Sequence, residues 1–98
     1  MSTTITPQAA GTALSAVTPA QIIGPNLSRT ALLIHNPNST GAIWIAPLGT
    51  TPAANAGGSF MIVAGADRLF TDTTRATCGW SAVMSTGSGF ASVLEFLP

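Results

Sequence analysis

Few residues in this chain have side chains suited to acid–base, nucleophilic or metal chemistry. Among 98 residues there is one histidine, His35, and one cysteine, Cys78. A catalytic triad needs a nucleophile, a base and an orienting group, and a metal site needs several ligands close together. No cysteine or aspartate lies at a ligand spacing from His35. We therefore expect His35 to hydrogen-bond its own loop or to contact a neighbouring molecule.

The carboxylates are equally sparse. Asp67 and Asp72 lie five residues apart, and such a pair can act as acid and base or bind calcium. Calcium loops bring more oxygen ligands than two, and Arg68 and Arg75 stand beside these carboxylates, which favours local ion pairing. Glu95 lies in an apolar segment, and we expect it to pair with Arg29, Arg68 or Arg75, across strands or across a subunit boundary. The sequence thus predicts no enzyme, no metal site and no cofactor.

Two tryptophans suggest another kind of site. Trp44 and Trp80 stand in alternating segments, where aromatic side chains are usually part of a core or an interface. Cys78 shares a predicted face with Trp80 and is expected to behave as a small hydrophobe. Exposed tryptophans also stack on sugars. A carbohydrate-binding module that uses Trp44 or Trp80 therefore remains an alternative.

The charge content of the chain is unusually low. Charged residues make up 6% of the sequence, with three arginines, three acidic residues, no lysine and a formal net charge of zero. A typical domain carries about 25% charged residues. Net charge keeps free proteins apart, and lysine is depleted in interface cores. This composition favours a homo-oligomer, for which a trimer is our expectation, or a larger assembly.

The same composition excludes several function classes. Three scattered arginines cannot replace the counterions of a nucleic acid. The apolar runs reach four or five residues, whereas a membrane-spanning helix needs about 20. The first eleven residues lack the charged and apolar regions of a secretory signal. We therefore expect neither nucleic acid nor membrane as a partner.

Short alternating segments separated by turn residues dominate the chain and predict an all-β fold. No segment keeps a helical period, and the strand-like runs recur every 10 to 15 residues. We predict a small antiparallel β-sandwich or barrel of six to eight short strands. Residues 1–11 are expected to form an extended N-terminal arm and residues 12–98 a single domain. The expected strands are 12–18, 29–35, 42–47, 59–64, 68–72, 77–85 and 90–97.

The segment LLIHNPNSTGAIWI, residues 32–45, reads as two strands joined by a polar loop. Because strand side chains alternate between faces, His35 and Trp44 would lie opposite the core side of a β-hairpin. A tryptophan on that side needs cover from a second sheet or from another subunit. The expected core positions are Leu32, Ile34, Ile43 and Ile45.

Residues 28–70 carry a recognisable order of strands and turns. Arg29 opens a strand that ends before Asn36, a short loop leads to the strand 42–46, and the step Gly58-Ser59 begins another strand before a turn at Gly65. This order resembles small virion structural proteins of tailed bacteriophages. The resemblance implies an all-β fold and a structural place in the virion, such as capsid decoration, cement, or a spike or fibre base.

From these observations we expect a virion protein that decorates or cements the capsid by bridging neighbouring shell subunits. Its partners would be the major capsid protein or other virion proteins, and its location the virion, assembled in the host cytoplasm. A tail, spike or fibre-base component is the alternative within the same class. The residues expected at the interface are Arg29, His35, Trp44, Arg68, Arg75 and Glu95.

Overall fold

The computed structural model describes residues 4–7 and 11–98. These residues form nine strands and one five-residue helix. The strands are β1 (Thr4–Pro7), β2 (Thr12–Ser15), β3 (Ala20–Ile23), β4 (Ala31–His35), β5 (Ile43–Pro47), β6 (Phe60–Ile62), β7 (Asp67–Phe70), β8 (Trp80–Met84) and β9 (Ser88–Leu97), and the helix is α1 (Thr73–Thr77).

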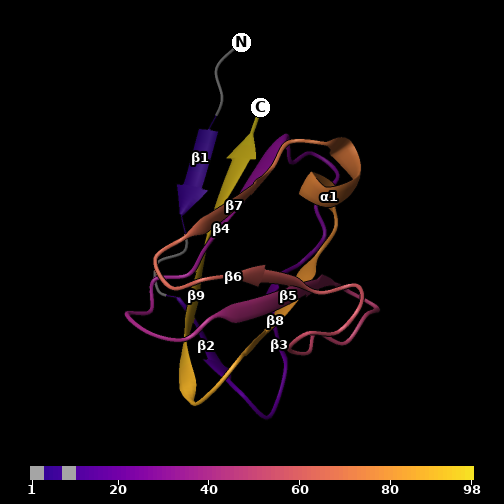
Figure 1. Ribbon diagram of the computed structural model, residues 1–98. Helices are drawn as coiled ribbons and strands as arrows, with labels where there is room; N and C mark the ends of the chain where they lie inside the picture. The colour runs from indigo at the N-terminus through magenta and orange to yellow at the C-terminus, as the bar shows by residue number, and fades with distance from the viewer. Residues whose placement is uncertain (1–3, 8–10) are drawn as a thin grey trace.

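The strands form two antiparallel sheets, which confirms the predicted all-β sandwich (Figure 1). The first sheet has the order β1-β9-β4-β7, and β2 pairs with the other half of β9. The second sheet has the order β3-β8-β5-β6. If β1 and β2 are counted as one position, this is the connectivity of an eight-position jelly roll. The chain changes sheet at nearly every connection.

Part of the expected N-terminal arm belongs to the first sheet. β1 pairs with the end of β9, with Thr4 opposite Leu97 and Ile5 opposite Phe96. The other residues of the expected arm, apart from Gly11, lie outside the described residues. β1 therefore contributes an edge strand to its own domain.

The predicted β-hairpin over residues 32–45 is wrong. β4 pairs with β7 and β9 in the first sheet, whereas β5 pairs with β6 and β8 in the second. The connecting loop is a corner that is held by the buried side chain of Asn36. Its Nδ2 donates to the carbonyl oxygens of Gly41, at 3.0 Å, and Ile62, at 2.8 Å. Alternation along a strand predicts which side is buried, but it carries no information about the partner strand.

A second asparagine ties this corner to β9. The Nδ2 of Asn38 donates to the carbonyl oxygen of Phe90 at 2.9 Å, and the amide of Phe90 donates to Asn38 Oδ1 at 3.0 Å. Asn38 thus provides the donor and acceptor that a neighbouring strand would provide. A Cβ on Gly89 would collide with the Asn38 side-chain amide, so this contact requires glycine at position 89.

The core lies between the two sheets. All four expected core positions are fully buried, namely Leu32, Ile34, Ile43 and Ile45. Trp80 stacks on Phe70 with ring centroids 4.7 Å apart and an interplanar angle of 5°. The Trp80 indole also donates to the carbonyl oxygen of Arg75 at 3.0 Å. The core therefore joins β7 and β8 across the sheets and anchors α1 to them.

Candidate interaction surface

Arg29 and Glu95 form an ion pair inside one end of the sandwich. Nη2 and Nε of Arg29 lie 2.6 and 2.9 Å from Oε1 of Glu95. The other N–H groups of Arg29 donate to the carbonyl oxygens of Gly24, Ala76 and Cys78 at 2.8, 3.0 and 3.2 Å. An arginine side chain has five N–H groups, so every donor of Arg29 is used within the chain.

This geometry changes the role expected for Arg29. Its side chain is 1% exposed, against 21% for Glu95, and it has no donor left for a partner. The expected pairing of Glu95 with an arginine is present, with Arg29 as that arginine. We therefore assign Arg29 and Glu95 to the interior and leave them out of the contact surface.

The remaining arginines are also engaged within the chain. Nε of Arg75 lies 2.8 Å from Oδ1 of Asp72, and the guanidinium lies over the ring of Phe70. The backbone N–H of Arg75 donates to Asp72, the N-cap of α1. That hydrogen bond, with the guanidinium, holds the pKa of Asp72 below its ordinary value. Arg68 extends from β7 over the ring of Phe60 at 5.5 Å, which closes one open side of the sandwich.

His35, Asp67 and Ser92 form one row across the first sheet. The register sets His35 of β4 opposite Asp67 of β7 and Ser92 of β9. The Nδ1 of His35 contacts the Asp67 carboxylate. These are the residue types of a catalytic triad, but among the described contacts His35 makes no hydrogen bond with Ser92. We interpret the row as a polar border on the sheet, where the His35 and Asp67 side chains are 38% and 52% exposed.

Beside this row lies an apolar surface that we call the open face. It consists of the outward side chains of the first sheet, Ile5, Leu33, Leu69, Phe90, Leu94 and Phe96. The register aligns them across strands, with Ile5 beside Phe96 and Leu94 beside Leu33 and Leu69. Ile5 and Leu69 are each 55% exposed and Phe90 is 53% exposed. The polar row lies between Phe90 and the other five side chains, and these five form the contiguous apolar part of the face. Contiguous apolar surface marks interaction sites.

The open face was not predicted from the sequence, although the residue pattern of β9 indicates it. Phe90, Leu94 and Phe96 alternate with Ala91 and Val93, so the strand is apolar on both sides. A strand that is apolar on both sides is expected to be covered on both sides. Among the described residues, the Ala91 and Val93 side of β9 is buried, whereas Phe90 on the other side is 53% exposed.

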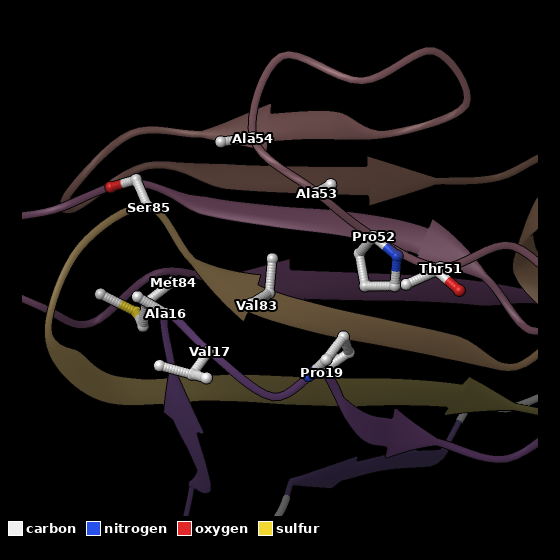
Figure 2. A pocket seen from close by; sticks show the side chains of 10 residues that line it. All are labelled: Ala16, Val17, Pro19, Thr51, Pro52, Ala53, Ala54, Val83, Met84 and Ser85. Atoms are coloured by element: carbon white, nitrogen blue, oxygen red, sulfur yellow. The ribbon is translucent and has the colours of Figure 1, made fainter.

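The outward side of the second sheet, which we call the covered face, is different. Trp44 lies between Val83 and Met61 there. Val83 is only 5% exposed although it points away from the core. The loop of residues 48–58 passes over this side, and its Pro52 is buried (Figure 2). The chain thus covers this face with its own loop.

A groove remains between that loop and the β2–β3 connection. Its volume is about 250 Å³, and Figure 2 shows the side chains that surround it. Residues 16, 17 and 19 line one side, residues 51–54 the other, and Val83 lies at the bottom with Met84 and Ser85. The lining side chains are uncharged, and the groove exposes both polar and apolar groups.

The two tryptophans differ in what they can bind. Trp80 is 1% exposed and stacked in the core, so it cannot serve as the platform for a sugar that the sequence allowed. Trp44 is partly exposed on the covered face. Cys78 is partly buried, and this burial raises the pKa of its thiol, which disfavours the reactive thiolate.

The described residues show neither a metal-binding cluster nor a membrane-spanning helix. Among the described residues, no three histidine, cysteine, aspartate or glutamate side chains gather to hold a metal ion. In the same part of the chain, no helix has the length and apolar character needed to cross a membrane. No family model, curated protein or solved structure matches the chain.

Proposed function

We propose that this protein is a bacteriophage-type virion structural protein that decorates or cements a capsid. The observation that carries the proposal is the combination of internally engaged charges with large apolar side chains exposed on both sides of a jelly roll. Jelly rolls are common in viral capsid and lectin domains. A fold alone does not determine a function, so the proposal rests mainly on the exposed apolar surfaces.

Bridging two shell subunits requires two contact surfaces. The open face supplies one. The second sheet and its flanking loops supply another, because they carry the remaining large apolar side chains that are at least 40% exposed, namely Val17, Leu27, Leu48, Met61 and Val63. Separating a cement protein from its shell would return this apolar surface to water, which is unfavourable.

The expected partners follow from the same surfaces. The major capsid protein or other virion proteins would be held by apolar and main-chain contacts. Arg68 and Arg75 are engaged within the chain but keep exposed area at the edges, and His35 and Trp44 lie beside the two apolar surfaces. A tail, spike or fibre-base position uses the same contacts and stays the alternative within this class.

Purified virions provide the test. Particles from the source of this chain would be separated on a density gradient, then analysed by mass spectrometry and electron cryo-microscopy. We expect the chain to copurify in many copies per particle and to fit density on the shell surface. Particles that are complete and stable without the chain would contradict the proposal.

A second candidate function is carbohydrate binding through Trp44. The partly exposed position of Trp44, next to Met61 on the covered face, favours it, because aromatic rings on exposed surfaces stack on sugars. Binding on a glycan array that Trp44→Ala abolishes, in a variant with unchanged thermal unfolding, would establish this function.

A further inference from the structure

We infer that the open face binds the same face of a second copy of this chain. The pair would be isologous, with the first sheet of one copy packed on the first sheet of the other. The inference goes beyond the proposed function, because it holds whether or not the pair belongs to a virion. In a virion, an open face that is covered by a second copy would not contact the shell, and the second sheets of the two copies would then bridge the shell subunits.

The size of the face favours a second copy over a short peptide. The first sheet is four strand positions wide, and β9 is ten residues long. The four positions hold 10 residues in β9, 8 in β1 and β2 together, 5 in β4 and 4 in β7. With a strand spacing of about 4.8 Å and a rise of about 3.3 Å per residue, this sheet covers roughly 430 Å². A stable interface buries about 800 Å² on each partner. A second sheet with its flanking side chains comes nearer to that size than one docked strand, which would leave most of the face in water.

The charges of the face also favour a second copy. Among its described outward side chains the ionisable ones are His35 and Asp67, which contact each other. Pairing two open faces therefore buries no carboxylate that lacks a partner. The chain has a formal net charge of zero, so two copies do not repel each other. A strongly charged partner would find no complementary charge on the apolar rows.

The shape of the face agrees with this pairing. Two sheets pack face to face about 10 Å apart with nearly aligned strands, and two copies of one sheet have the same twist. A two-fold axis through the apolar rows sets Leu33 and Leu94 of both copies in the centre. The row of His35, Asp67 and Ser92 borders these apolar rows, as polar residues border the core of most interfaces.

The test measures the mass of the full chain in solution. Light scattering after size exclusion, at micromolar concentration, is expected to give twice the 9.8 kDa of one chain. Leu69→Glu brings a charge into the contact and should raise the dissociation constant at least about tenfold. The matched control is Val17→Glu, because Val17 is 89% exposed and lines the groove with Val83 on the side of the second sheet. That variant should remain paired.

Folding of each variant is checked by thermal unfolding, and Ile5→Glu serves as a second probe of the open face. A wild-type monomer at micromolar concentration would overturn the inference. So would a trimer, which the sequence favoured, because a face-to-face contact closes with two copies. A pair that Val17→Glu separates while Leu69→Glu and Ile5→Glu leave it intact would also overturn it. None of these results depends on whether the chain copurifies with virions.

Discussion

Both sheets carry large apolar side chains on their outward sides, but the exposure of these side chains differs. On the covered face Val83 is 5% exposed, because the 48–58 loop passes over it, whereas on the open face Leu69 is 55% exposed. Both residues occupy similar outward positions in paired strands. The difference lies in the connection between neighbouring strands, since the β5–β6 loop is long enough to fold back over its sheet. The described loops of the first sheet leave its outer face uncovered.

The loops that connect the strands thus determine which outward face stays exposed and can contact a partner. A charge introduced on the covered face should therefore disturb folding, and a charge on the open face should disturb association.

Val83→Glu is expected to have the largest effect. A carboxylate at this position would be buried without a partner, which is among the few changes that cost about 4 kcal/mol or more. We expect chemical denaturation to show a largely unfolded protein. Leu69→Glu is the matched change on the open face and should alter the free energy of unfolding by no more than about 1 kcal/mol. Equal destabilisation by the two variants would remove the distinction between the faces.

Glu95→Gln tests whether the interior, rather than either face, holds the charges. Loss of the charged acceptor for Arg29 should cost about 1–3 kcal/mol of unfolding free energy. In double-mutant cycles measured by chemical denaturation, coupling of about 0.5–3 kcal/mol is expected with Arg29→Lys.

The cycles with Arg68→Met and Arg75→Met are the controls. These arginines lie on Phe60 and beside Asp72, so their coupling to Glu95 should be near zero. Coupling of equal size for all three arginines would show that the pair observed here is not specific.

Pro52→Gly should make the covered face resemble the open one. Loss of the ring uncovers part of Val83 and increases the freedom of the unfolded chain, together worth about 1–2 kcal/mol. Thermal unfolding and binding of a hydrophobic dye measure the two consequences. Pro25→Gly changes an exposed proline and should not raise dye binding. Equal dye binding by both variants would argue against a covering role for the loop.

Asp72→Asn should have the smallest effect, because this N-cap lies on neither face. The pKa of Asp72 is lowered in the folded protein by the backbone hydrogen bond from Arg75. A lowered carboxyl pKa stabilises the fold above the unfolded value, near 3.8, and this contribution disappears as the pH falls through the folded value. The melting temperatures of the two proteins should therefore differ slightly at neutral pH and converge in acid. A difference that grows in acid would contradict this assignment.

The sequence predicted which side of a strand is buried, but it did not predict which strands pair. The period of two along residues 31–35 and 43–47 predicted correctly that Leu32, Ile34, Ile43 and Ile45 form the core. It could not predict that the two strands belong to different sheets, because that depends on distant strands and on the buried amide of Asn36.

The same limit applies to the polar contacts. Sequence reasoning narrowed the partner of Glu95 to three arginines, but Arg29 is 66 residues away and only the β4–β9 register brings it close. His35 and Asp67 are 32 residues apart and meet because β4 pairs with β7. The short helix α1 was missed because five residues are too few to show a helical period, although Asp72 is a good N-cap.

The position of β9 in the first sheet has a consequence for synthesis. β9 is the last of the described strands in the sequence, yet it lies between β4 and the β1–β2 edge. A ribosome adds about 5–20 residues per second, so the first sheet lacks its central strand until translation of the domain is almost finished. Long-range pairing of this kind also folds slowly. We therefore expect the open face to form only after β9 has been made, so that association through this face, as inferred above, would not begin on nascent chains that lack β9.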